Sequence, residues 1–478
     1  MRTKALSVLT ALTALTALTP VPVAAQSYAE LGPGARRFVS VSDTVVALEH
    51  VQLVDGTGAQ PVNDQTVLIS SGKIAGVGPS SSFKVPAGAK RMDLTGHTVL
   101  PGLVGMHDHT FYTTPARGTQ ANYTSPLLYL ASGVTTIRTT GSYSPYHEIN
   151  LKRTVDAGRL PGPHMYVTGP YLTGETGNGS MHQVLTPEAA RRVVSYWASE
   201  GVSWLKFYTT VSRDVLKAAV DEAHKNGVKV TGHLCSVSFT EAVAAGIDNL
   251  EHGLFVNTDY SENKQPDACP QGATATYSEL DLSSDEVRHT FKTMIDNDVP
   301  MTSTLAVYEL FVPNRPPVEQ RTLDAMSPDV RTEYLQARVQ IAQSAGFGLS
   351  PELFAKGQAF ELAFVRAGGL LAAGVDPTGN GGALPGFGDQ RNFELLVEAG
   401  FAPVEAVQIM SLNGAKVLDG DAEFGSIAAG KRADLVVIKG DPTAKPAEIR
   451  NVVTVFKDGV GYDSPRMIEA VRGQVGVR

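Results

Sequence analysis

The chain has 478 residues, of which 42% are hydrophobic and 18% are charged. This composition excludes a disordered chain, and the length allows one large domain or about two to three ordinary ones. The 40 Lys and Arg residues against 48 Asp and Glu residues give a net charge of -8. That balance gives no basic footprint that would point to nucleic acid or anionic lipid as a partner. Chemistry on a small molecule is therefore the function class that the composition favours.

The N-terminus has the pattern of a secretory signal. Arg2 and Lys4 precede an uncharged run rich in Ala, Leu, Thr and Val, and residues 23–25 (Val-Ala-Ala) fit the small-residue rule for cleavage. We expect residues 1–25 to be a cleaved signal peptide and the mature protein to be exported, to a bacterial periplasm or outside the cell. No other run approaches the roughly 20 apolar residues of a membrane span, so no membrane association is expected after cleavage.

Two cysteines are present, Cys235 and Cys269. They are too few for a disulfide framework. In an oxidising compartment the two can form a bond, and two unpaired small residues are the alternative.

Short β-rich runs lie near both ends of the chain, separated by turn residues such as Asp55-Gly56. These runs are residues 45–54, 66–77 and 91–100 near the start and residues 434–439 and 451–457 near the end. We predict that residues 26–101 and 419–478 build one small β-sandwich subdomain from both ends of the chain.

Between residues 102 and 418, short apolar runs alternate with helical, charged segments, which indicates βα units and a parallel sheet. Eight strand candidates occur there, the number that closes a barrel. They are residues 104–109, 134–139, 165–171, 204–208, 229–233, 249–252, 300–305 and 370–376. The predicted fold is therefore α/β, a (β/α)8 TIM barrel over residues 102–418. Two long connections, residues 254–282 and 306–357, are expected at its mouth. The second contains a helical stretch over residues 328–344 and is either a partial lid or a decorative insertion.

Histidines and one carboxylate follow these strands at their carboxyl ends. His107 and His109 are two residues apart on the first strand, so both imidazoles point to the same face, an arrangement typical of metal ligands. Other polar candidates at strand ends are Lys206, His233, His252 and Asp376. Each has an ordinary structural explanation, but active sites of this fold lie where these residues converge.

The ordered motifs resemble the metal-dependent amidohydrolase superfamily over nearly all of the mature chain. The motifs are LPGLVGMHDHT, SWLKFY, VTGHL, NLEHG, GVDPTG and the tail GSIAAGKRADLVVIKGDP. Among its members the chain looks closest to the exported Xaa-Pro dipeptidase-like and imidazolonepropionase-like branch, through the phrase NFELLVEAGFAPVEAVQIMSLNGAKVLDG. It departs just upstream, where Gln390 to Phe393 replace the His and Glu frequent in relatives, so an altered specificity is expected.

The resemblance implies two divalent metal ions, zinc being the expected identity, with a carboxylated Lys206 as the bridging ligand. It implies that His107, His109 and Asp376 hold the more buried ion, and that His233 and His252 hold the other. Two metals would generate a bridging hydroxide, and Asp376 would act as the general acid and base. The implied reaction is cleavage of amide bonds in dipeptides such as Xaa-Pro or in N-acyl amino acids. A homo-oligomer is compatible with the resemblance.

Several alternatives remain open at this stage. The same site would also suit lactones, cyclic amides or phosphoesters, and manganese, cobalt or iron would fit the ligands as well. A single-metal ring hydrolase or deaminase is disfavoured because the Glu expected three residues after His233 is replaced by Ser236. A non-catalytic binding protein on the same fold is the remaining class.

Three side chains are predicted to contact the substrate. Tyr208 shares a strand face with Lys206, His182 lies in the TGNGSMH loop, and Arg391 offers a bidentate fork for a carboxylate. Packing or surface roles are the alternatives for all three. Arg138 is predicted to be a structural ion-pair partner.

Overall fold

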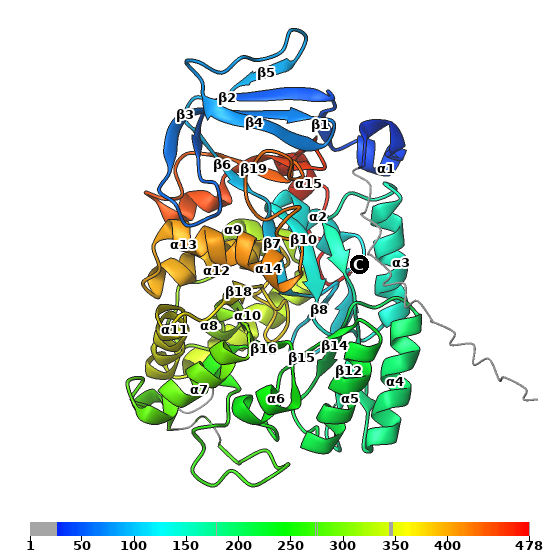
Figure 1. The fold of residues 1–478 in the computed structure, drawn as a ribbon, viewed down its shortest axis with the longest axis vertical. Coiled ribbons are helices and arrows are strands. Elements are labelled where there is room, and N and C mark those ends of the chain that lie inside the picture. Colours follow the sequence, from blue (N-terminus) through cyan, green and yellow to red (C-terminus); the bar gives the residue numbers. More distant parts are fainter. Residues whose placement is uncertain (1–25, 178, 273, 275, 344–347, 478) are drawn as a thin grey trace, which may run out of the picture.

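The computed structural model describes residues 26–177, 179–272, 274, 276–343 and 348–477 (Figure 1). The predicted signal peptide, residues 1–25, lies outside the described residues. The parallel strands lie in the middle of the molecule with helices around them, and a separate sheet lies at one end (Figure 1).

The central strands form at all eight predicted places. They are β7 (Leu103–Asp108), β10 (Val134–Thr139), β11 (His164–Tyr166) with β12 (Thr168–Thr173), β14 (Trp204–Phe207), β15 (Lys229–Gly232), β16 (Asn249–Glu251), β17 (Met301–Ser303) and β18 (Leu371–Ala373). The third predicted strand is divided in two, because Thr168 donates its backbone N–H to the Thr139 hydroxyl rather than to a ladder carbonyl, at 2.9 Å.

The strands follow the order of a TIM-barrel-type α/β fold. Parallel pairing runs β11-β10-β7 and β13 (His182–Gln183)-β12-β14-β15-β16-β17-β18. Among the described residues no ladder pairs β18 with β7, so the closed barrel stays a prediction. The two strands nevertheless meet, since the Asp376 N–H donates to the His107 carbonyl at 2.8 Å. Gly374 permits this approach, because a Cβ there would lie 2.2 Å from the His107 nitrogen.

Helices connect the strands; α4, α5 and α7 each bury one apolar face, whereas α2 is buried along its whole length. They are α2 (Thr124–Ala131), α3 (Pro145–Asp156), α4 (Pro187–Ser199), α5 (Arg213–Lys225), α6 (Phe239–Ala245), α7 (Asp285–Asp296), α12 (Phe387–Glu398), α13 (Pro403–Gln408) and α14 (Gly414–Val417). Helix α4 begins at a Thr-Pro pair. Its start is set by Thr186, whose hydroxyl accepts a hydrogen bond from the Ala189 N–H, with Pro187 in the first turn.

Residues 306–357 are more helical than predicted. They contain most of α8 (Leu305–Glu309), α9 (Gln320–Ala325), α10 (Pro328–Gln343) and the start of α11 (Pro351–Arg366). Helix α10 buries Val330, Tyr334 and Ile341, so this segment is packed against the body of the molecule.

The two ends of the chain share one nine-stranded sheet. Its strands are β1 (Val39–Val41), β2 (Val45–Leu53), β3 (Val62–Ser70), β4 (Lys73–Pro79), β5 (Lys90–Asp93), β6 (His97–Pro101), β19 (Leu435–Lys439), β20 (Val452–Lys457) and β21 (Val460–Asp463). Antiparallel pairing of β6 with β19, from Pro101–Leu435 to His97–Lys439, joins the two ends. The hydrogen bonds define a single mixed sheet, and its arrangement as a sandwich stays a prediction.

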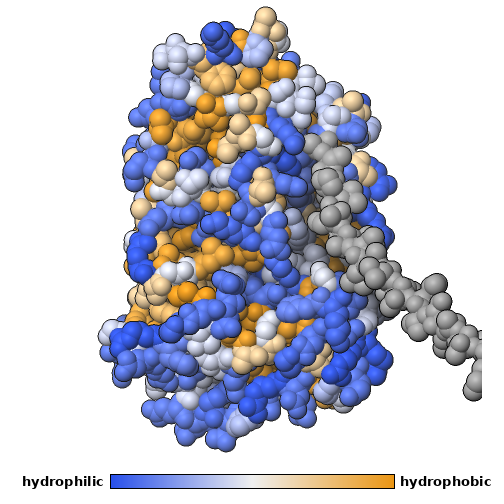
Figure 2. Space-filling model, in the orientation of Figure 1, coloured by the Kyte–Doolittle hydropathy of each residue, from blue (hydrophilic) through white to orange (hydrophobic). Residues whose placement is uncertain are grey.

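The surface differs between the two ends of the molecule. On the face shown in Figure 2, hydrophobic side chains gather over the end that holds the sheet, whereas the opposite end is mostly hydrophilic. None of the helices in the described ranges is both long enough and apolar enough to cross a bilayer.

Candidate active site

The predicted metal ligands converge at the carboxyl ends of the parallel strands. His107 lies in β7 and Lys206 in β14, while His233, His252 and Asp376 follow β15, β16 and β18. These five residues line a common cavity of about 320 Å³. His109 is fully buried and reaches the group through Asp376. The structure therefore brings together all six residues that the sequence singles out.

Short distances connect the members of this cluster. Asp376 is 3.6 Å from His107 Nε2 through one carboxylate oxygen and 3.4 Å from His109 Nε2 through the other. Lys206 Nζ lies 3.2 Å from His107 Nε2. The rings of His107 and His233 each lie 4.5 Å, between centroids, from the ring of His252. Nitrogen and oxygen donors therefore face one another from five strands.

Two of these residues have a backbone conformation that side chains disfavour. His252 has φ of 66° and Asp376 has φ of 48°. The left-handed region costs free energy for any residue other than glycine, and such strain clusters at functional sites. His252 directly follows β16 and Asp376 is the third residue after β18, and the side chains of both line the cavity.

Burial controls the charges of the cluster. Burial, with the nearby Lys206 charge, lowers the pKa of His107 well below its usual value, and burial with the same charge lowers the pKa of His233 to about 3. The imidazoles are therefore neutral, as metal ligands must be. Burial would raise the pKa of Asp376, but His107, His109 and Lys206 hold it below its ordinary range, so this carboxylate is ionised.

Lys206 carries a buried amine that lacks a carboxylate partner. Its side chain is 1% exposed, and no described Asp or Glu side chain lies within 4.0 Å of its amine. Burial lowers the pKa of Lys206 to about 8. An unpaired buried ammonium is costly, so this environment disfavours the plain charged amine.

The donor set fits a divalent metal ion. The carboxylate of Asp376 and one nitrogen each of His107 and His252 all lie within 4.8 Å of one another. His252 Nε2 is buried and has no hydrogen-bond partner among the described residues, while its Nδ1 bonds the Thr304 hydroxyl at 2.7 Å. A metal-ligating imidazole usually has one ring nitrogen available for the metal and the other in a hydrogen bond, as in His252.

Glu251 contacts the Nδ1 atom of His107, and this residue was not predicted from the sequence. Its carboxylate lies 2.8 Å from His107 Nδ1 and accepts hydrogen bonds from Arg138 at 2.5 Å and from Asn249 at 2.9 Å. The ion pair confirms the structural role predicted for Arg138. The signal was available, because Glu251 directly precedes His252 in the NLEHG motif.

The three predicted substrate contacts lie in different surroundings. Tyr208 lines the cavity beside His233, with 4.6 Å between ring centroids. His182 is exposed at the start of β13, and its neighbour Met181 lines the cavity instead.

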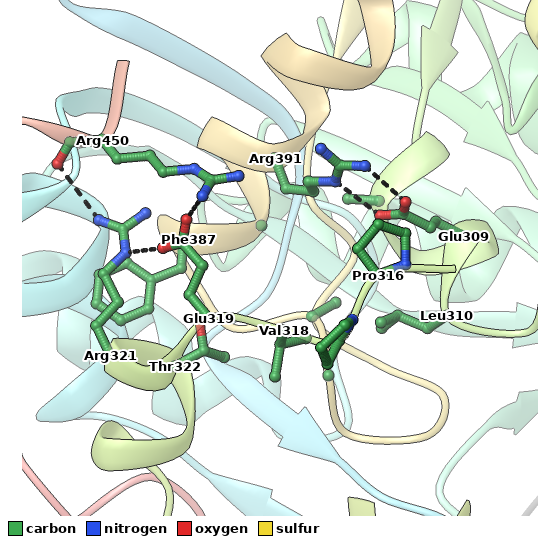
Figure 3. Close-up of a pocket in the computed structure, with 15 residues that line it drawn as sticks. Glu309, Leu310, Pro316, Val318, Glu319, Arg321, Thr322, Phe387, Arg391 and Arg450 are labelled. Atoms are coloured by element: carbon green, nitrogen blue, oxygen red, sulfur yellow. Dashed lines mark hydrogen bonds and ion pairs between the residues drawn. The ribbon is translucent and has the colours of Figure 1, made fainter. Parts of the chain in front are cut away.

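Arg391 lines a second cavity of about 170 Å³ rather than the cavity of the metal ligands. Figure 3 shows its guanidinium directed at Glu309, with distances of 2.8 and 2.7 Å to the two carboxylate oxygens. Glu394 takes a third hydrogen bond from it. The Arg391 guanidinium, which was predicted to bind a substrate carboxylate, is therefore bound by Glu309 and Glu394 of the protein itself.

A disulfide joins Cys235 to Cys269, with 4.9 Å between the Cα atoms. It ties the segment that follows His233 to the connection of residues 254–282. Thr258 donates to the Cys235 carbonyl at 3.0 Å, and Lys264 donates to the Ser236 carbonyl at 2.6 Å. The connection is therefore fixed to the mouth of the cavity near His233.

A second buried cluster lies where β11 meets the end sheet. His164 Nε2 is 3.3 Å from Asp458 and 4.0 Å from Asp434. These three side chains could also hold an ion by distance alone. Arg432 bonds Asp434 at 3.0 Å, and the buried Lys457 adds a further positive charge.

Comparison with known proteins identifies the family. The model of the amidohydrolase family matches residues 98–268 and 368–461, more than half of the chain. The chain therefore belongs to the amidohydrolase family, and the resemblance read from the motifs is confirmed.

Solved structures agree with this assignment. A candidate prolidase from Bifidobacterium longum is 26% identical, covers 89% of this chain and 98% of its own, and has a TM-score of 0.64. A Xaa-Pro dipeptidase with methionine bound in its active site is 21% identical, with 88% and 100% covered and a TM-score of 0.65. A bottromycin amidohydrolase is 19% identical, with 96% and 97% covered and a TM-score of 0.66. The last two likenesses concern the fold alone.

The curated relatives add little about function. An uncharacterized protein of Mycobacterium bovis is 36% identical over 121 residues, which are 24% of this chain and 31% of that protein. The alignment thus spans about a third of the length of the curated relatives that it matches.

Proposed function

We propose that the protein is a binuclear-metal hydrolase that cleaves amide bonds in small molecules, with dipeptides such as Xaa-Pro or N-acyl amino acids as its substrates. The observation that carries the proposal is the convergence of neutral histidines, an ionised Asp376 and a buried unpaired Lys206 on one cavity. The names of similar structures, a Xaa-Pro dipeptidase and a prolidase complexed with N-methylphosphonate-L-proline, support the substrate class.

The ligand set divides between two ions. His107, His109 and Asp376 would hold one ion and His233 and His252 the other, with Lys206 shared as a carbamate; zinc suits this set. Carboxylation would replace the unpaired ammonium with an anion. Two bound ions would supply activation of water and polarisation of the scissile carbonyl.

Asp376 is the residue that moves protons in this proposal. Its carboxylate is ionised, lies at the cavity and is fixed by Thr378, whose hydroxyl donates to Oδ1 at 2.8 Å. It would accept a proton from the attacking water and deliver it to the leaving amine. Tyr208 would contact the substrate from the same wall.

The disulfide supports export, since such bonds persist in oxidising compartments. We therefore propose an exported, periplasmic or extracellular enzyme whose signal is residues 1–25. A homo-oligomer is compatible with this proposal.

Metal content per chain, measured by elemental analysis on protein purified with bicarbonate, tests the proposal. We expect about two ions per wild-type chain and fewer in Lys206→Ala. Lys229→Ala is the matched control, because Lys229 lies at the opposite end of a neighbouring strand and pairs with Asp419 at 2.5 Å.

One ion in both wild type and Lys206→Ala would contradict the shared lysine and would direct the search to single-metal ring hydrolases. The metal-loaded protein should then be assayed on amides, lactones and phosphoesters. Absence of turnover on all of these substrates would contradict the proposed enzymatic function and would favour a non-catalytic binding protein.

A further inference from the structure

Aromatic side chains from four parts of the chain line the cavity next to the metal ligands. Tyr171 and Tyr208 come from β12 and from the residue after β14, and Tyr143 follows β10. Tyr308 lies in α8 and Phe311 follows it. None of the five is needed as a metal ligand, and sequence reasoning identified only Tyr208.

The aromatic rings form two groups, and each group packs against its own neighbours. Tyr171 lies 5.3 Å from Tyr143 and 5.7 Å from Tyr208, between ring centroids. Tyr308 stacks on Phe255 at 4.1 Å. Phe311 rests against Gly379, where an added Cβ would lie 2.9 Å from its ring. The rings are therefore packed against one another or against neighbouring residues.

Four of the five rings remain accessible although they are surrounded by protein. Tyr143, Tyr208, Tyr308 and Phe311 are half-buried, whereas Tyr171 is buried. A ligand beside these rings would therefore cover apolar area that water now contacts, which is the main source of favourable binding free energy.

These aromatic side chains carry no formal charge of their own. Among the described residues that line the cavity, only Lys206 and Asp376 of the ligand set are formally charged.

Arginines near the site do not change this balance. Arg391 is held by Glu309 and Glu394, and Arg117, in the neighbouring depression, is paired with Glu333. The internal residues outside the described ranges, 178, 273, 275 and 344–347, are all of uncharged types. A charged substituent placed against these aromatic rings would lose hydration without gaining an ion-pair partner from them.

We propose that Tyr143, Tyr171, Tyr208, Tyr308 and Phe311 form a subsite for an aromatic or large apolar, uncharged substituent next to the scissile amide. The inference rests on the proposed amide hydrolysis for the role of the bound group, but the subsite itself is a binding property that can be measured separately. The expected substrates are amides with a Phe-like or Leu-like group, in preference to those with acidic or basic side chains.

The test uses the metal-loaded full chain and two matched measurements. Binding of N-acetyl-phenylalanine amide, N-acetyl-alanine amide and N-acetyl-glutamic acid amide is measured by calorimetry. Hydrolysis is measured on blocked dipeptides that carry Phe, Ala, Glu or Lys on either side of the scissile bond. We expect the Phe ligand to bind about 10- to 100-fold more tightly than the Ala ligand, and a similar ratio in kcat/KM on one side of the bond.

Phe311→Ala should reduce the Phe-over-Ala ratio by about tenfold. Tyr143→Ala should have the same effect and serves as the second variant if Phe311→Ala unfolds. Tyr196→Ala, an exposed tyrosine on α4 that is 48% accessible, is the control and should keep the wild-type ratio.

The possible outcomes separate the two proposals. Equal or better binding of the Glu ligand, or variants that keep the wild-type ratio, would overturn the subsite even if amides are hydrolysed. Preferential binding of the Phe ligand without hydrolysis of any amide would support the subsite and overturn the proposed function.

Discussion

Two buried clusters of potential metal ligands occur among the residues that the structure describes, and they differ in their compensating charges. Around His107, His252 and Asp376, Lys206 is the cation that lines the same cavity, into which the group opens. Around His164, Asp434 and Asp458, the cations of Arg432 and Lys457 already balance the two carboxylates.

The difference teaches that spacing alone does not define a metal site. A buried carboxylate needs a partner, and in the second cluster the protein supplies it. That cluster connects β11 of the parallel sheet to β20 of the end sheet, through His164 and the Asp458 that follows β20. We interpret it as an ion-pair network that fastens the two layers, whereas the first cluster is left for a ligand to complete.

The largest expected effect is on turnover, from Asp376→Asn at the first cluster. The amide keeps the size of the side chain but cannot accept the proton, so kcat should fall by about 10²- to 10⁴-fold. Metal content should stay near the wild-type value, because one side-chain oxygen remains. Steady-state kinetics and elemental analysis of the same preparation check both expectations, and a fully active variant would refute the assignment.

The counterpart at the second cluster is Asp458→Asn, which should affect stability rather than turnover. Asn tolerates the left-handed backbone of this position, where φ is 53°. Loss of the charge leaves His164, Arg432 and Lys457 under-compensated, so the free energy of unfolding should fall by about 3 kcal/mol. Denaturant unfolding measures this, and kcat/KM of the folded variant should match wild type.

The pH dependence of that loss follows from the direction of the pKa shift. Burial opposes ionisation of Asp458, but His164 and the neighbouring cations lower its pKa. A depressed folded-state pKa stabilises the protein above the ordinary carboxyl value and the benefit is lost as the pH falls. The difference between Asp458→Asn and wild type should therefore shrink below about pH 4. A constant difference from pH 7 to pH 3 would contradict the ion-pair interpretation.

A smaller effect is expected from Glu251→Gln, which weakens the support of His107. Carboxylates behind metal-ligating histidines typically contribute about 10- to 100-fold to metal affinity. Competition with a chelator measures that affinity directly. Glu361→Gln is the matched control, since Glu361 is equally buried and bonds Ser303 at 2.8 Å rather than a histidine. Equal metal affinity in both variants would show that Glu251 only fills space.

Much of the fold could be predicted because the signals are local. Strands β10 and β15 are short runs with β-branched residues close to Gly133 and Gly227, and α4 has a Thr-Pro start, so residue type, length and capping define them. The break at Val167 could not be predicted, because it depends on a hydrogen bond between Thr139 and Thr168 of different strands. Within residues 306–357 the helical stretch predicted over residues 328–344 is present as α10. Helices α8 and α9 and the start of α11 were missed, since turn-forming residues such as Pro316 and Pro317 interrupt the pattern.

The convergence of the six ligands could likewise be predicted, because the carboxyl ends of parallel strands meet at one edge. The surroundings of Arg391 could not be predicted, because its partner Glu309 is 82 residues away in the sequence and no spacing rule relates the two. The same holds for Tyr308 and Phe311, whose place in the cavity depends on how α8 turns after β17.

The pairing of β6 with β19 has a consequence for biosynthesis. Pro101 leaves the ribosome long before Leu435, its partner in the ladder, so the edge of β6 stays open while the whole parallel domain is made. Pairings this distant in sequence form late and leave exposed strand edges that favour aggregation. A nascent chain released before residue 435 would lack β19 and would expose the β6 edge permanently. Such a truncated chain is expected to aggregate rather than to remain as a soluble, inactive fragment.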